Sequence, residues 1–213
     1  MQLKKCISLV WMLLASVMVY AQSDDFTTWT NFKISHKIDS RFSVAGNLEM
    51  RTEDDMNAID RWGLSVGGDY SALSFLKLEL GYETHYRNLG GEGWKFRHRY
   101  RVGAIVSFRH QWLKVSLRER FQQTFDRGNS ETRLRSRLKL SYAPSKSIVS
   151  PYFSIEIYQS LDDASFWRAA RMRYRPGVEI DLAKRWSLDA FYCYQYESSV
   201  GKHIAGIEVG YSF

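Results

Sequence analysis

The chain has 213 residues, of which 30 are Lys or Arg and 23 are Asp or Glu, so its formal net charge at pH 7 is +7. This length suits a single domain. Beyond residue 21 the sequence has no apolar run long enough for a spanning helix, which excludes a helical membrane protein. Only Cys193 lies beyond that point, which excludes an intrachain disulfide in the secreted form expected below.

Residues 1–21 have the pattern of a cleaved secretory signal peptide. Two lysines precede an apolar stretch over 7–19, and a small-x-small cleavage site ends at Ala21. The apolar stretch is short for a membrane anchor. Cleavage leaves residues 22–213 as one domain with 28 basic and 23 acidic residues, a formal charge of +5.

The remaining sequence is typical of β-strands, because apolar residues alternate with small or polar ones over long stretches. Eleven candidate strands can be counted, the first over 28–36. The last strand shows the pattern most clearly, with an apolar or aromatic residue at every second position: His203, Ala205, Ile207, Val209, Tyr211 and Phe213. An aromatic C-terminal residue on such a strand is typical of bacterial outer-membrane barrels. The sequence therefore predicts an all-β fold, a transmembrane antiparallel outer-membrane β-barrel of about 10–12 strands.

The predicted connections alternate in length, as they do in outer-membrane barrels. Short turns are expected at 37–40, 73–75, 109–111 and 183–185, with an intermediate connection at 143–147. Longer polar loops are expected at 52–60, 88–93, 126–130, 161–165 and 198–202. Aromatic residues gather near both ends of the apolar stripes and predict two girdles at the membrane interfaces.

A soluble β-sandwich or lipocalin-like barrel is the competing interpretation, with its apolar face turned inward. Predicted strands of 12 to 16 residues are long for a sandwich, in which about 5–6 residues is typical. A soluble exterior also rarely needs arginine at every second position on neighbouring strands. Both observations favour the membrane barrel.

The strand count conflicts with this interpretation. Bacterial single-chain barrels have an even number of strands. If the C-terminal strand ends on the periplasmic side, residues 28–36 run parallel to it. Either this segment lies outside the wall and ten strands remain, or a strand is missing from the count and there are twelve.

Several short segments carry a family resemblance: Trp29-Thr30, Glu49-Met50-Arg51 followed by Asp54-Asp55, Ile59-Asp60-Arg61-Trp62, Gly81-Tyr82-Glu83 and the final Gly210-Tyr211-Ser212-Phe213. With these segments the chain resembles the outer-membrane β-barrel family catalogued as domain of unknown function 2490, common in Bacteroidetes-type bacteria. The resemblance spans the mature chain and implies a fold and the bacterial outer membrane as its location. It brings no catalytic residues with it.

If the apolar positions face lipid, the alternate positions face the lumen and carry most of the charge. The predicted basic cluster is Arg97, Arg99, Arg101, Arg118, Arg120, Arg133, Arg135, Arg137, Lys139, Arg171, Arg173 and Arg175. The predicted acidic partners are Glu49, Glu79, Glu83, Glu156, Glu179, Asp189, Glu197 and Glu208. Arginines that cross a narrow lumen to carboxylates can form bidentate pairs.

Two non-enzymatic interpretations of this cluster stay open. A salt-bridge network can plug a barrel of this width and give it a structural role. Alternatively, the surplus of positive charge lines a narrow pore that favours small anions. A barrel that serves as a scaffold for a partner protein is a further alternative.

An outer-membrane hydrolase acting on lipid or peptide is the enzymatic alternative. The histidines His36, His85, His98, His110 and His203 stand in no recognisable motif. Of these, His85 is expected in the lumen close to Glu83, where a histidine is usually a hydrogen-bonded lining residue. We therefore expect no catalytic residues.

Glu119 falls in the lipid-facing phase, where a charge is costly. Either its strand has left the membrane there, which we favour, or a bulge shifts the phase, or a partner covers it. The sequence shows no metal-binding cluster and no phosphate-binding glycine loop, so we expect no cofactor or metal. The expected partners are outer-membrane lipids and lipopolysaccharide, the barrel-assembly machinery at the C-terminal strand and, for a pore, small anions. Nucleic acid is not expected, since the chain is exported and its arginines face inward.

Overall fold

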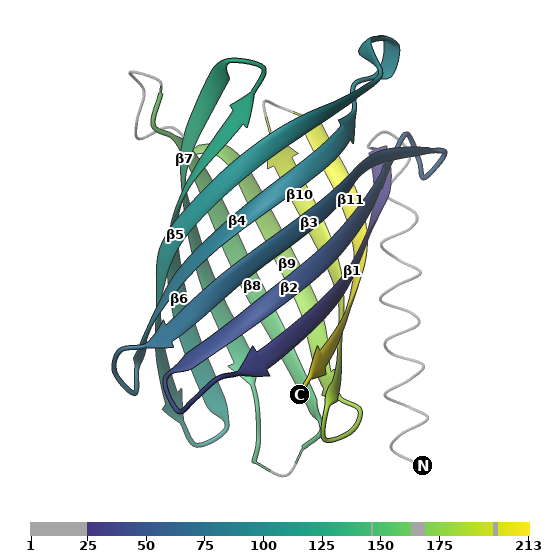
Figure 1. Cartoon of the computed structure of the whole chain (residues 1–213). Coiled ribbons are helices and arrows are strands. Elements are labelled where there is room, and N and C mark those ends of the chain that lie inside the picture. Colours follow the sequence, from purple (N-terminus) through teal and green to yellow (C-terminus); the bar gives the residue numbers. More distant parts are fainter. Residues whose placement is uncertain (1–24, 146, 163–168, 198–199) are drawn as a thin grey trace, which may run out of the picture.

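The computed structural model describes residues 25–145, 147–162, 169–197 and 200–213, and these ranges form one closed barrel of eleven strands (Figure 1). The strands are β1 (Asp25–Lys37), β2 (Phe42–Glu53), β3 (Ala58–Ser71), β4 (Leu76–Asn88), β5 (Trp94–His110), β6 (Leu113–Asp126), β7 (Asn129–Tyr142), β8 (Val149–Ser160), β9 (Ala169–Asp181), β10 (Trp186–Glu197) and β11 (Val200–Ser212). A short 3-10 helix, η1 (Gly90–Glu92), lies between β4 and β5. Within the described ranges no helix has the length and apolar character to cross a membrane. The expected signal peptide over 1–21 lies outside the described residues.

The predicted all-β barrel is confirmed, and each strand pairs with its sequence neighbours in antiparallel fashion. The barrel is closed by a parallel pair, in which Asp25 to Ser35 of β1 lie beside Lys202 to Ser212 of β11. The expectation of either ten or twelve strands was wrong, because residues 28–36 belong to β1 and β1 lies in the wall. The parallel pair leaves no strand edge unpaired, so the backbone N–H and C=O groups at the seam find hydrogen-bond partners although the number of strands is odd.

The two rims of the barrel can be told apart by the start of β1 and the end of β11 (Figure 1). β1 and β11 both run from the rim at which Asp25 lies, here called the upper rim, to the rim at which Phe213 lies, here called the lower rim. At the lower rim the backbone N–H of Phe213 donates to the carbonyl of Ser35 (3.1 Å). The parallel seam is therefore hydrogen-bonded up to the last residue.

The predicted alternation of short turns and long loops was largely wrong. Strands continue into three of the five expected long loops, which shrink to connections over 54–57, 127–128 and 198–199; the last lies outside the described residues. Arg127 and Gly128 have φ angles of 51° and 86°, which suits a two-residue hairpin turn. Polar residues at the strand ends resembled loops in composition, although strand pairing continues through them.

Large apolar side chains cover the outside of the barrel. Leu64 and Leu80, for example, are 62% and 65% exposed, although both lie in the middle of long strands. Aromatic rings pair near both rims: Phe42 with Tyr70 (4.6 Å) and Trp186 with Tyr211 (4.8 Å) at the lower rim, and Tyr86 with Trp94 (5.0 Å) at the upper rim. An exterior of this kind needs an apolar environment.

Glu119 lies in the middle of β6, between Leu117 and Phe121 on the outer face. Its register is regular on both sides, opposite Ala104 of β5 and Ser136 of β7. The explanation by a bulge was therefore wrong. The Ser136 hydroxyl donates a hydrogen bond to the carboxylate of Glu119 (2.6 Å). The other two explanations, a strand that has left the membrane at this point and a partner that covers the charge, stay predictions.

A small apolar core lies inside the barrel, on the wall formed by β8 to β11 and β1. Tyr152, Phe191, Cys193 and Ile204 are buried there, and Trp29 packs against them. Gly206 makes this packing possible, because a Cβ at its position would lie 2.0 Å from the ring of Phe191. The rest of the interior is polar.

Candidate functional site

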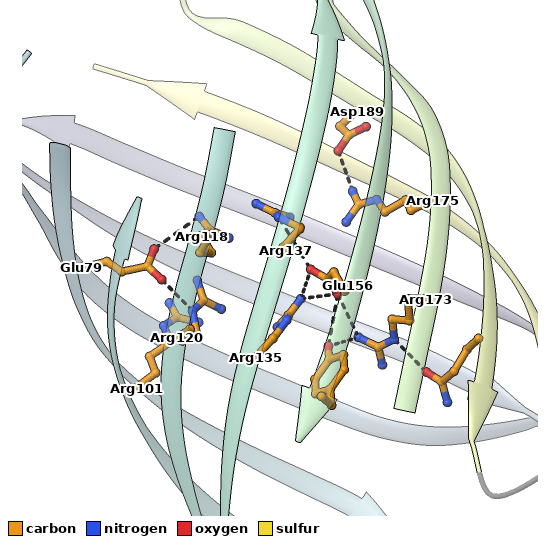
Figure 2. Close-up of polar contacts among 12 residues, drawn as sticks. Glu79, Arg101, Arg118, Arg120, Arg135, Arg137, Glu156, Arg173, Arg175 and Asp189 are labelled. Carbon is orange, nitrogen blue, oxygen red and sulfur yellow. Dashed lines mark hydrogen bonds and ion pairs between the residues drawn. The ribbon is translucent and has the colours of Figure 1, made fainter. Parts of the chain in front are cut away.

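The strand alternation brings charged side chains from almost every strand into the interior. Within that interior two regions differ: an upper region filled by an arginine–carboxylate network, and a lower region with open space. Figure 2 shows part of both, with Glu156 among three arginines in one and Glu79 beside Arg118 and Arg120 in the other.

Glu156 is the centre of the upper network. The residue is only 3% exposed, and Nη2 of Arg135 donates to both of its carboxylate oxygens, at 2.7 and 2.9 Å. Arg137 and Arg173 approach the same carboxylate at 3.6 and 3.7 Å, and the Tyr158 hydroxyl donates to it at 3.3 Å (Figure 2). One buried acid thus compensates charge from β7 and β9.

Two further carboxylates, nearer to β2 to β5, also compensate the charge of neighbouring arginines. Glu83 is paired with Arg101 and, at 3.1 Å, with Arg99, and His85 lies 3.2 Å from it. On β2, Glu49 contacts two arginines: Arg51 at 2.7 Å and Arg61, from β3, at 3.2 Å. Glu156, Glu83 and Glu49 therefore each contact at least two cationic or imidazole groups.

Aromatic rings pack against the guanidinium groups of the upper region. The guanidinium carbon of Arg51 lies 3.7 Å from the centroid of the Trp29 ring, and that of Arg173 lies 4.7 Å from the same ring. Arg173 also lies 4.9 Å from the ring of Tyr158, and Arg135 stands 5.0 Å from that ring. Cations stacked on rings in this way bridge from β1 and β2 to β7, β8 and β9, so the stack crosses the lumen.

The lower region contains a cavity of about 370 Å³. Glu79 projects toward it and contacts Arg120 at 2.7 Å and Arg118 at 3.3 Å. On the opposite wall Asp189 contacts Arg175 at 2.7 Å and accepts a hydrogen bond from the Tyr152 hydroxyl at 2.8 Å. These pairs line the cavity wall and leave the space between them open.

A second cavity of about 280 Å³ continues this space downward. It shares Arg137, Lys139 and Glu179 with the first cavity and extends to the β3–β4 turn around Leu73 and Phe75. Lys139 contacts Glu179 at 2.5 Å. The lower region therefore opens toward the lower rim.

The structure places the other predicted lumen residues in smaller pairs. These are Arg97 with Asp126 (2.6 Å), Arg133 with Glu131, and Arg171 with Glu197 (2.6 Å). Glu208 lines the lower cavity and makes no ion pair within the described ranges. The predicted residues thus fall into two regions instead of one cluster.

Sequence reasoning missed several members of the network. Arg51 and Arg61 lie at inner-phase positions of their strands, so the alternation that identified the other arginines was sufficient to find them. Trp29 was missed because the position of its strand in the wall was open. Asp60 was missed because it lies at a strand end that was taken for loop, and Arg87, its partner at 2.8 Å, lies at the end of a predicted strand.

A separate ion pair joins two connections at the upper rim. Nη1 of Arg127, in the β6–β7 turn, donates to the carboxylate of Glu92 in η1 at 2.7 Å. The Arg127 guanidinium holds the pKa of the exposed Glu92 carboxyl below its usual value.

Three of the histidines contact polar groups of the barrel. His85 is 5% exposed and enclosed in the network, while His98 contacts the Tyr82 hydroxyl and His36 contacts the Phe213 carbonyl (2.9 Å). Among the residues that the structure describes, no group of three or more His, Cys, Asp or Glu is arranged to hold a metal ion.

Fold and interior together define a closed all-β barrel with an apolar exterior and a charged, partly filled lumen. The chain belongs to the family described as "Protein of unknown function (DUF2490)", whose model matches residues 26–204. The resemblance to this family is therefore confirmed. No curated protein matches the sequence.

Among solved structures, the chain is similar to the "Translocator domain of autotransporter NalP from Neisseria meningitidis". The identity is 17%, the TM-score is 0.47, and the match covers 79% of this chain and 73% of that chain.

Proposed function

We propose that the protein is a non-enzymatic outer-membrane β-barrel whose lumen is closed to ion flow and whose arginine network has a structural role. The observation that carries this proposal is the stack of Trp29, Arg51, Arg173, Tyr158 and Arg135 across the upper lumen. Packed rings and paired guanidinium groups leave little room for a hydrated ion. The network joins strands that are far apart around the wall.

The exposed apolar exterior supports a membrane location. Its aromatic pairs at both rims match the girdles of outer-membrane barrels. In the proposed orientation the lower rim faces the periplasm, lipid and lipopolysaccharide surround the wall, and the barrel-assembly machinery recognises the C-terminal strand.

Conductance of the refolded protein tests the closed lumen. We expect a planar bilayer that contains the wild-type protein to show no conductance steps. The Arg99→Ala plus Arg135→Ala variant removes partners of Glu83 and Glu156, and we expect its unfolding midpoint in urea to fall. Arg127→Ala, which removes a cation of the upper rim outside the network, is the matched control and should unfold like the wild type.

The alternative of a narrow anion-favouring pore predicts the opposite result. Anion-selective steps of the wild-type protein, altered by the Arg99→Ala plus Arg135→Ala variant but not by Arg127→Ala, would overturn the proposal.

A scaffold for a partner protein is the second candidate. The outward-facing pair of Glu119 and Ser136 favours it, because a carboxylate at mid-height is costly in lipid and less so beneath a polar partner surface. Cross-linking from position 136 in intact outer membranes tests this candidate: a single protein adduct supports it, and lipid adducts alone contradict it.

A further inference from the structure

The cavity of about 370 Å³ in the lower region is lined by two arginines whose positive charge is only partly compensated. Arg118 of β6 and Arg137 of β7 lie directly opposite each other in the strand register, and both line the cavity. Like charges at opposed positions destabilise a sheet unless something else compensates them.

The nearby acids do not provide that compensation in full. Glu79 lies 3.3 Å from Arg118, but its other oxygen accepts a 2.7 Å hydrogen bond from Arg120. Glu156 lies 3.6 Å from Arg137 and is already held by Arg135 at 2.7 Å. The buried Nε of Arg118 has no hydrogen-bond partner among the described residues.

The side chains that line the cavity also carry an excess of positive charge. Seven basic and five acidic side chains line it. Lys139, whose ammonium group contacts the half-exposed carboxylate of Glu179, lies two residues from Arg137 at the junction with the second cavity of about 280 Å³. A small anion that enters from the lower rim meets this surplus before it meets the closed upper network.

We infer that Arg118, Arg137 and Lys139 form a binding site for a small phosphate-bearing solute. Two guanidinium groups present paired N–H donors that match phosphate oxygens, and the ammonium group adds a further positive charge. The cavity of about 370 Å³ has the size of a small-ligand pocket. The closed upper network makes it a blind pocket that is loaded from the lower rim. This inference goes beyond the structural role proposed above.

Titration calorimetry of the refolded wild-type protein tests the site, with inorganic phosphate and pyrophosphate as probes and sodium chloride at equal ionic strength as the reference. We expect saturable binding of at least one phosphate probe. Arg118→Gln and Arg137→Gln each remove a charged donor, so each should weaken binding by about tenfold. Arg97→Gln is the matched control, because Arg97 pairs with Asp126 outside the cavity, and it should bind like the wild type.

Two results would overturn the inference: no saturable binding by the wild-type protein, or equal weakening by Arg97→Gln and Arg118→Gln, which indicates general charge attraction. If an arginine variant does not refold, Lys139→Gln replaces it, because Lys139 lies nearer the open end, and unchanged binding by that variant counts against the site. Conductance is measured on the same preparation. A barrel that neither conducts nor binds phosphate contradicts only the binding site, and a barrel that conducts and binds phosphate contradicts only the closed lumen.

Discussion

The upper and lower regions of the lumen are built from the same residue types, yet paired charges and aromatic rings pack together in one and the other contains a cavity. In the upper region the acids are buried among the cations, as Glu156 is among Arg135, Arg137 and Arg173. In the lower region an acid such as Glu179 is 48% exposed at its side chain and contacts a single cation. The acid at the open end of the lower region therefore differs from Glu156 both in its exposure and in the number of cations that it contacts.

The neutral residues strengthen this difference. Trp29 and Tyr158 fill the space between the upper guanidinium groups. The lower cavity is bordered by small side chains of β2 and β3, among them Ala45, Ser65 and Gly67. The lumen is therefore narrower in its upper region, because aromatic rings and paired charged side chains occupy the same space there.

Removal of the Glu156 charge should have the largest effect. Glu156→Gln leaves Arg135, Arg137 and Arg173 without their shared carboxylate in a buried site, and we expect a loss of about 3 kcal/mol in the free energy of unfolding. Urea unfolding from lipid vesicles measures it.

The matched control for this variant is Glu208→Gln, which removes a carboxylate of the lower cavity that makes no ion pair within the described ranges. We expect its stability to stay close to that of the wild type. Equal losses in the two variants would show that the regions do not differ in the way described.

Gly206→Ala tests the apolar wall beside the network. The new methyl group would collide with the ring of Phe191, which packs against Trp29, so we expect a loss of about 1–3 kcal/mol. Gly91→Ala, at a position with no atom within 4 Å of the added Cβ, is the control. Urea unfolding again gives the difference, and similar values for both variants would argue against tight packing at Gly206.

Most of the fold was predictable from the sequence, because a two-residue period over long strands identifies the inner and outer faces without knowledge of the neighbours. The eleven candidate strands were also countable, but the place of the first strand in the wall was not predictable, since the parallel pairing of β1 with β11 is a long-range contact that leaves no local pattern. Loop lengths failed for a related reason: Asn129 and Lys202 are polar, but they pair across strands instead of lying in loops.

The candidate site was predictable as a set of inward charges but not as two regions. The alternation places Glu156 and Glu208 on the same kind of inner position. Strand tilt and register decide which cations each of them meets, and neither can be read from one strand alone. The role of Trp29 depended on the place of β1 in the wall, so the ring stack could not be anticipated.

The smallest expected effect concerns Glu179, at the open end of the lower region. Its ion pair with Lys139 is half-exposed, so Glu179→Gln should change the free energy of unfolding by less than about 1 kcal/mol. The same substitution removes one acid beside Lys139 and Arg137, and the larger positive surplus should strengthen phosphate binding at low salt. Calorimetry with inorganic phosphate, beside urea unfolding, separates the two effects. A large loss of stability would mean that the lower region is held together by its ion pairs as the upper one is, and weaker binding would mean that Glu179 orders the site instead of opposing the anion.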